Sequence, residues 1–206
     1  NGVLKDGVPK QTFTAKVRPG DIKYVDLDKN GFIDTYDQMA IGGTENPEIV
    51  YGFGVNLRWK ELDFGAMFQG IGRTWRILSS NIMPASNKGS MYNIFDNYQD
   101  RWTVDNQSQD VFYPRADYGP NANNSQKSTW WLRNMSFLRL KNLELGYSCP
   151  KKWLQGFVIS NARVFVRGTN LLTFSKFNLW DPELATGDGA KYPAMKSVSV
   201  GFDITF

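Results

Sequence analysis

The sequence predicts an all-β chain that supplies about five antiparallel strands to a large transmembrane sheet. Three observations predict this fold. Apolar and polar residues alternate in several segments of about ten residues, which is the pattern of a strand with two different faces. The connections between these segments alternate between short turns and long loops, as in a barrel that crosses an outer membrane. Aromatic residues make up 15% of the chain, and several fall at strand ends, where a membrane interface favours them.

The first two predicted strands form a hairpin. Residues 51–59 alternate between apolar side chains and small or charged ones, and residues 62–70 repeat the pattern. Only Lys60 and Glu61 separate the two segments. A connection of this length between alternating segments predicts a tight antiparallel pair.

Three further strands are predicted at residues 136–148, 162–174 and 197–206. The last of them, SVSVGFDITF, alternates without a break. In the first, the apolar positions change phase near Lys141 and Asn142, and a β-bulge at that point would keep the apolar side chains on one face.

The two longest connections, residues 73–130 and 175–196, are rich in Asn, Asp, Gly, Pro and Ser. We predict that they are extracellular loops and that the short connections lie on the periplasmic side. With this orientation, aromatic residues at the periplasmic strand ends form an interfacial girdle. The girdle residues are Trp59, Tyr147, Trp153 and Phe206.

Composition excludes several classes of function. The chain has no histidine and one cysteine, so classical catalytic triads and cysteine or histidine zinc sites are absent. The net charge of +4 comes from scattered basic residues, which does not indicate a nucleic-acid-binding surface. No run approaches the roughly 20 apolar residues of a membrane helix. Because the chain begins Asn-Gly-Val, we expect a processed or partial polypeptide.

Residues 26–37, DLDKNGFIDTYD, match the spacing of a twelve-residue calcium-binding loop. Oxygen donors occupy every ligand position, Gly31 stands where the loop turns sharply, and Ile33 can anchor it. Flanking helices are not evident, so we predict a Ca²⁺ loop on a β scaffold. The alternative is an acidic Asx-turn loop without an ion. The predicted ligands are Asp26, Asp28, Asn30, Phe32 through its carbonyl, Asp34 and Asp37.

The longest predicted loop combines aromatic and basic residues that could stack on sugar rings or hold an extended peptide. The alternative is that these side chains pack the loop upon itself or against a partner. The candidate substrate-binding residues are Tyr98, Arg101, Trp102, Arg115, Trp130 and Trp131. Phe206 ends an alternating strand and resembles the signal by which the barrel-assembly machinery recognises its clients.

Five motifs occur in a familiar order between about Arg18 and Phe206. Together they resemble the C-terminal part of the SusC/RagA family, the TonB-dependent outer-membrane transporters of Bacteroidetes. Cys149 departs from the aliphatic residue expected before PKKWL. The motifs are RPGDIKYVDLDKNGFID, YGFGVNLRWKELDFGAMFQG, FLRLKNLELGYSCPKKWL, ARVFVRGTNLLTFSKFNLWDPE and SVSVGFDITF.

The resemblance implies that residues 1–206 are one C-terminal segment of a barrel of about 22 strands. The rest of the barrel, with its amino-terminal plug, would lie outside this chain. A SusD-like surface lipoprotein would cap the barrel, and TonB would supply energy through a segment that is also outside. The expected substrates are oligosaccharides or peptides, and the expected location is the outer membrane.

Five strands are too few to close a barrel, so either several copies assemble or the chain belongs to a longer polypeptide. A different class of protein shows the same alternation: a secreted, calcium-stabilised β-sandwich that binds carbohydrate. A glycosidase would need two positioned carboxylates, and no motif selects a pair. We therefore do not expect an enzyme.

Overall fold

The computed structural model of the chain describes residues 5–14, 16–79, 82, 95–117, 119 and 121–206. The chain forms two compact units. Unit 1 contains residues 1–42 and 77–132, and unit 2 contains residues 43–76 and 133–206. No helix among the described residues has the length and apolar character needed to cross a membrane.

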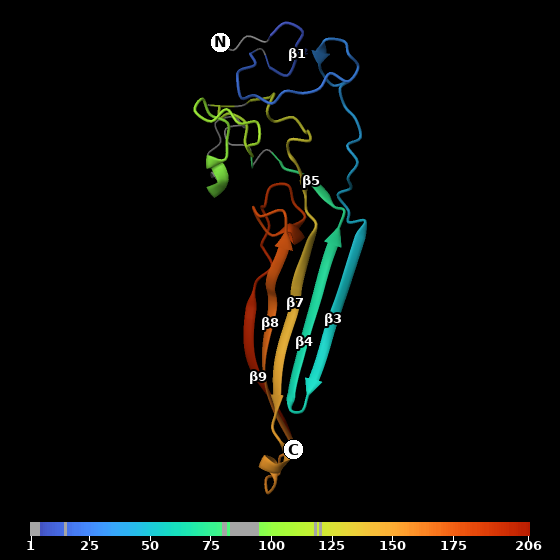
Figure 1. The fold of residues 1–206 in the computed structure, drawn as a ribbon, viewed down its shortest axis with the longest axis vertical. Helices are drawn as coiled ribbons and strands as arrows, with labels where there is room; N and C mark the ends of the chain where they lie inside the picture. The colour runs from blue at the N-terminus through green and yellow to red at the C-terminus, as the bar shows by residue number, and fades with distance from the viewer. Residues whose placement is uncertain (1–4, 15, 80–81, 83–94, 118, 120) are drawn as a thin grey trace. The chain divides into compact units, whose positions relative to one another are not determined.

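Unit 2 is built on one five-stranded antiparallel sheet with the order β3-β4-β7-β8-β9 (Figure 1). The predicted all-β fold with about five antiparallel strands is confirmed, and each strand ends within two residues of its predicted boundary. The strands are β3 (Ile49–Trp59), β4 (Leu62–Gly72), β7 (Phe137–Ser148), β8 (Asn161–Ser175) and β9 (Ser197–Thr205).

The predicted hairpin and the predicted bulge are both present. Trp59 pairs with Leu62 across the two-residue turn, in which Lys60 adopts a left-handed conformation with φ of 55°. The register of β7 shifts between Leu140 and Asn142 against both of its neighbours. The shift keeps the apolar residues of β7 on one face despite their change of phase.

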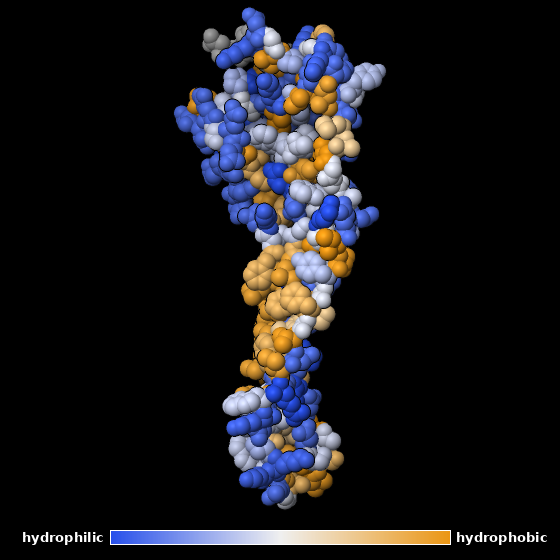
Figure 2. All heavy atoms as spheres, turned by 45° about the vertical axis from the view of Figure 1, so that its right-hand side comes forward, coloured by the Kyte–Doolittle hydropathy of each residue, from blue (hydrophilic) through white to orange (hydrophobic). Residues whose placement is uncertain are grey.

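One face of the sheet is apolar and exposed. Register pairing places apolar residues side by side across all five strands, and Figure 2 shows hydrophobic side chains gathered over the sheet. Phe53 is 54% exposed and Phe202 is 75% exposed. A β-sandwich would bury these residues against a second sheet, so the structure does not support that alternative. One complete row consists of Leu57, Phe64, Leu145, Val166 and Val200.

The connections of unit 2 differ in length and structure. The β7–β8 connection contains the short helix α1 (Lys151–Leu154), and the β8–β9 loop contains the 3₁₀ helix η3 (Pro182–Leu184). Arg139 of β7, which is 1% exposed, forms ion pairs with Asp181 and Glu183. These ion pairs hold the β8–β9 loop against the strand.

The predicted loop of residues 73–130 begins with a short strand, β5 (Trp75–Ile77), which forms a two-stranded sheet with β6 (Leu132–Asn134). This strand was not predicted, because three residues are too few to show alternation. Positions 80–81, 83–94, 118 and 120 of the predicted loop lie outside the described residues.

Unit 1 has little regular structure and a core of its own. It contains the 3₁₀ helix η2 (Asp96–Gln99) and a two-stranded parallel sheet of β1 (Lys10–Gln11) and β2 (Phe32–Ile33). Its buried apolar residues come from segments far apart in the sequence, and each is at most 5% exposed. They are Ile22, Ile33, Leu78, Ile82, Tyr113 and Trp131.

Candidate functional site

The predicted calcium loop brings three carboxylates together. Oxygen atoms of Asp26, Asp28 and Asp37 all lie within 4.8 Å of one another. Gly31 has φ of 86°, a left-handed conformation that favours glycine, and its N–H donates to Asp26 Oδ2 at 2.9 Å. Asp26 Oδ1 is buried and has no hydrogen-bond partner among the described residues. An oxygen in this state is suited to a cation.

The other predicted ligands have different roles in the structure. The Asn30 side-chain oxygen accepts from the Phe32 N–H at 2.8 Å, and its amide donates to Asp28 Oδ2 at 2.9 Å. Asp34 lies outside the group of three carboxylates, and its Oδ1 accepts from the Tyr36 N–H at 2.7 Å. The three-carboxylate group is therefore the part of the predicted site that the structure assembles.

Backbone donors favour the charged form of Asp37. Its carboxylate accepts from the Asp34 N–H at 2.9 Å and from the Leu27 N–H at 2.7 Å. These two hydrogen bonds hold the pKa of Asp37 below its ordinary value. A carboxylate that stays ionised is suited to a divalent cation.

Residues 10–12 form hydrogen bonds with the predicted calcium loop, a contact that the sequence does not indicate. The Lys10 N–H donates to Gly31 O at 2.9 Å, and the Thr12 N–H donates to Ile33 O at 3.1 Å. The Thr12 hydroxyl donates to the same oxygen at 2.7 Å. Ile33 is 2% exposed, so the predicted anchoring of the loop by this residue is observed.

A groove in unit 1 lies where three segments meet, residues 18–20, 101–104 and 113–116. Hydrogen bonds between backbones fix them: the Trp102 N–H donates to Tyr113 O at 3.0 Å, and the Arg115 N–H donates to Gly20 O at 2.9 Å. The groove has a volume of about 410 Å³. Its lining includes Arg18, Pro19, Arg101, Trp102, Val104 and Arg115.

The three arginines of the groove differ in their electrostatic environment. Arg115 Nε lies 2.7 Å from Asp21 Oδ1, and its Nη2 lies 2.6 Å from Asp117 Oδ2. Arg101 donates from Nη1 to Tyr98 O at 3.0 Å, and its guanidinium lies 4.5 Å from the centre of the Tyr98 ring. Within the described part of the chain, neither Arg18 nor Arg101 forms an ion pair.

The six predicted substrate-binding residues therefore divide into two groups. Tyr98, Arg101, Trp102 and Arg115 are brought together at the groove or beside it. Trp131 is 1% exposed and donates from Nε1 to Asn124 O at 2.9 Å, which makes it a core residue without a surface for substrate. Trp130 is half-buried and donates from Nε1 to Phe112 O at 3.1 Å.

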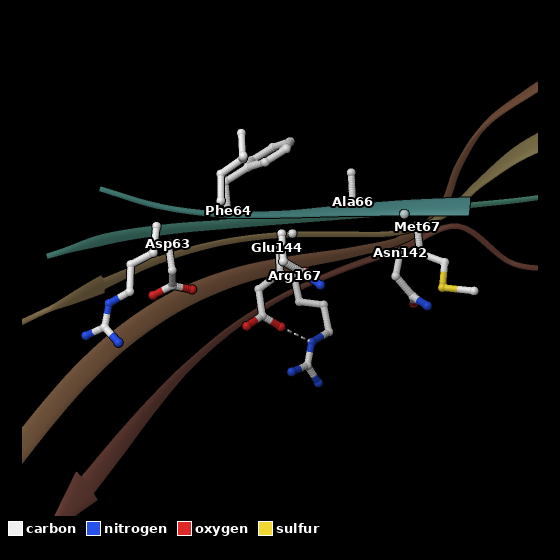
Figure 3. Close-up of a pocket in the computed structure, with 12 residues that line it drawn as sticks. Asp63, Phe64, Ala66, Met67, Asn142, Glu144 and Arg167 are labelled. Carbon is white, nitrogen blue, oxygen red and sulfur yellow. Dashed lines mark hydrogen bonds and ion pairs between the residues drawn. The ribbon is translucent and has the colours of Figure 1, made fainter. Parts of the chain in front are cut away.

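The polar face of the sheet carries a second group of charges. Figure 3 shows Asp63, Glu144 and Arg167 projecting to one side of the sheet and Phe64 to the other. Arg167 Nε donates to Glu144 Oε2 at 2.6 Å. A depression of about 440 Å³ lies over these residues.

Arg163 connects the charges of this face. Its Nη2 donates to Glu144 Oε1 at 2.7 Å, and its Nε donates to Asp63 Oδ1 at 3.0 Å. A Cβ at Gly146 would lie 2.3 Å from Arg163 Nη2 and 2.5 Å from Asp63 Oδ2. Gly146 thus leaves the space in which this ion pair forms.

No family model matches the chain. It is 32% identical over 202 residues to a TonB-dependent receptor of Formosa agariphila, a match that covers 91% of this chain and 20% of the relative. It is 24% identical over 205 residues to the TonB-dependent receptor SusC of Bacteroides thetaiotaomicron, covering 97% of this chain and 19% of SusC. The structure matches the RagAB peptide importer in its open-open state with a TM-score of 0.67 and 33% identity, over 89% of this chain and 20% of that one.

The chain belongs with the SusC/RagA-like TonB-dependent receptors. It spans about one fifth of the length of these relatives, 20% of the receptor from Formosa agariphila and 19% of SusC. The five-stranded sheet of this receptor segment is the part with the clearest strand pattern in the sequence.

Several residues that organise this SusC/RagA-like segment were not among the predicted site residues. Asp21, whose side chain is fully buried, and Arg18 belong to a motif that supported the resemblance, but nothing in it showed that they lie beside Arg115. Arg163, Asp63 and Glu144 occupy polar positions of alternating strands. The alternation predicts that these three side chains lie on the polar face of the sheet. Which of them contact one another depends on how the strands are paired, which the alternation does not predict.

Proposed function

We propose that this chain is the C-terminal part of an outer-membrane β-barrel that imports oligosaccharides or peptides with energy from TonB. The observation that supports the proposal most directly is the exposed apolar face, which runs across all five strands opposite a polar face. In water such a face would be covered by another layer, whereas acyl chains are its natural environment in a barrel. The two sheet edges would pair with the rest of the barrel, which would also hold the plug.

The same proposal assigns the sides of the membrane and the partners. The turn at Lys60 and Glu61 and the β7–β8 connection would be periplasmic, and unit 1 and the β8–β9 loop would be extracellular. A SusD-like lipoprotein would cap the extracellular side. The likeness to the RagAB peptide importer supports peptides among the two substrate classes.

Adjacent residues of β9 provide a test of lipid exposure. Val200 is 71% exposed on the apolar face, and Ser199 points to the opposite face. Val200→Arg in the full-length receptor should cost about 2–4 kcal/mol of folding free energy near mid-membrane. Ser199→Arg should cost less, at most about 1 kcal/mol, which includes the repulsion from Arg167 directly across on β8. The amount of folded receptor in outer-membrane fractions measures both.

Equal effects of the two substitutions would contradict the proposal. So would a full-length protein that purifies without detergent as a soluble monomer. Both outcomes are informative because the two residues are neighbours in one strand and differ mainly in the side of the sheet that they occupy.

We propose further that residues 26–37 bind Ca²⁺. The residues fit this ion: three carboxylates converge, and Asp26 Oδ1 has no partner among the described residues. Asp26, Asp28 and Asp37 would hold the ion, and the spacing offers the oxygens of Asn30, Phe32 and Asp34 as further donors. The bound ion would offset the repulsion between the carboxylates and stiffen the loop. It would have no catalytic role.

Titration calorimetry of the full-length receptor with Ca²⁺ tests this site. Asp26→Asn/Asp37→Asn should abolish the binding heat, whereas Asp105→Asn, an exposed acid of the same unit, should leave it unchanged. At 100 times the dissociation constant, Ca²⁺ should stabilise the folded loop by about 2.7 kcal/mol. Unaltered binding by the double variant would reject the site, and so would the absence of binding by the wild type.

A further inference from the structure

We propose that the unit 1 groove binds a peptide segment that carries a carboxylate next to an apolar side chain. The groove is lined by residues 18–19, 101–104 and 115–116. The inference rests on the proposed import function and narrows its substrate class. It depends on three properties of the groove: a fixed backbone, two guanidinium groups without a carboxylate partner, and apolar walls.

The backbone of the groove is held in place before any ligand binds. The N–H groups of Trp102 and Arg115 connect its three segments through hydrogen bonds of 3.0 and 2.9 Å. The Trp102 ring packs on Gly20, where a Cβ would lie 2.3 Å from Trp102 Cε3. A preorganised site loses little conformational entropy on binding.

The charges of the groove favour an anion. Arg115 pairs with both Asp21 and Asp117, and these three side chains together carry one negative charge. With Arg18 and Arg101 the groove has a net charge of about +1. Asp21 has further hydrogen bonds to the side-chain amides of Asn121 and Asn124, at 3.1 and 2.9 Å. Its contacts with Arg18 are through the backbone of that residue: the Arg18 N–H donates to Asp21 Oδ2 at 2.8 Å, and the Asp21 N–H donates to Arg18 O at 3.1 Å.

Two positive charges consequently remain without a carboxylate partner among the described residues. Arg18 is exposed, and Arg101 uses one guanidinium nitrogen for the Tyr98 carbonyl. Each guanidinium has further N–H donors for a ligand carboxylate, which it can bind in a bidentate manner.

The walls favour a peptide over an oligosaccharide. Pro19, Val104 and Ala116 line the groove with apolar surface. One side-chain hydroxyl, that of Thr103, is part of the lining, and it accepts from the Asn106 N–H at 2.9 Å. Sugar hydroxyl groups are donors as well as acceptors, and the nearby carboxylates that could accept from them are occupied by Arg115. An acidic side chain next to an apolar one fits both the guanidinium groups and the walls.

The test measures binding of two labelled peptides to the purified full-length receptor at low salt. One peptide has the sequence Gly-Leu-Glu-Leu-Glu-Leu-Gly, and the other has Gln in place of both Glu residues. Fluorescence anisotropy gives the dissociation constants. The wild-type receptor should bind the acidic peptide about tenfold or more tightly than the neutral one, because hydrogen bonds between charged groups are strong.

Variants identify the groove as the source of this preference. Arg18→Gln/Arg101→Gln should remove the preference for the acidic peptide, and Arg18→Glu/Arg101→Glu should reverse it towards a peptide with Lys in place of Glu. The matched control is Lys23→Gln/Lys127→Gln, which neutralises two exposed lysines of the same unit outside the groove. The control should keep the wild-type preference.

Equal binding of the acidic and neutral peptides by the wild type would overturn the inference, as would a preference that survives in the Arg18→Gln/Arg101→Gln variant. These outcomes leave the proposed transport function intact, because that function is tested separately, by the two substitutions in β9 and by the need for detergent in purification.

Discussion

Substituting Gly146 by alanine should destabilise the sheet. The Arg163–Asp63 ion pair forms in the space that Gly146, which has no Cβ, leaves open. The new methyl carbon would lie 2.3 Å from Arg163 Nη2 and 2.5 Å from Asp63 Oδ2. Ordinary contacts begin at about 3.5 Å, so the two side chains must each move by about 1 Å. The contact between Arg163 and Asp63 would then be lost.

The size of the effect follows from the environment of the pair. The atoms that the new methyl would meet are the ends of two flexible side chains, which can turn aside at little cost. The Arg163 and Asp63 side chains are 19% and 30% exposed, so losing their attraction adds at most about 1 kcal/mol. We expect Gly146→Ala to lower the free energy of unfolding by about 1 kcal/mol in total.

Urea unfolding of the full-length receptor in lipid vesicles, followed by tryptophan fluorescence, measures this change. Gly72→Ala is the control, because a Cβ at Gly72 would lie at an ordinary 3.5 Å from the Ile49 Cβ. In an Arg163→Ala background, Gly146→Ala should cost much less, because the side chain that it displaces is gone. The reasoning is wrong if Gly146→Ala and Gly72→Ala are equally stable.

Two further substitutions and one deletion address other parts of the chain. Arg139→Ala should destabilise the β8–β9 loop by about 3–5 kcal/mol because Asp181 loses its partner; protease cleavage within residues 175–196 should rise, and Arg139→Ala/Asp181→Ala should restore part of the resistance. Ile33→Ala should cost about 2–5 kcal/mol in unit 1, because this residue is 2% exposed, whereas Val25→Ala at a residue 72% exposed should leave thermal unfolding nearly unchanged. Deleting Phe206, which follows β9 and is 81% exposed, should lower the amount of receptor in the outer membrane, and normal surface levels would contradict its proposed role in assembly.

The strands could be predicted because each is long enough for its alternation to be unambiguous. The bulge in β7 could be predicted for the same reason: a change of phase within one continuous strand leaves few other solutions if one face must stay apolar. The observed shift between Leu140 and Asn142 is where the pattern breaks. Local sequence therefore carries most of the information on unit 2.

Unit 1 was less predictable because its structure depends on contacts between distant, irregular segments. The strand β1 consists of two residues, and its pairing with β2 joins positions 22 residues apart. The Arg115–Asp21 ion pair joins segments on either side of the whole β3–β4 hairpin. The sequence predicts Trp131 as a candidate substrate-binding residue. The residues around it show no alternation that would distinguish a buried aromatic side chain from an exposed one. The metal loop is the exception, since its ligand spacing is local.

The distribution of charge distinguishes the unit 1 groove from the depression on the sheet as a possible ligand site. On the polar face of the sheet, three cations (Arg58, Arg163 and Arg167) accompany three carboxylates (Asp63, Glu144 and Asp203), and ion pairs connect most of them. Because these charges balance one another, the polar face has a weak electrostatic field. It would therefore not attract a charged solute. In the unit 1 groove the carboxylates are occupied by Arg115, and Arg18 and Arg101 have no carboxylate partner among the described residues. These two unpaired guanidinium groups favour a ligand that carries a carboxylate. For this reason we propose that the groove recognises the ligand and that the charges on the sheet have a structural role.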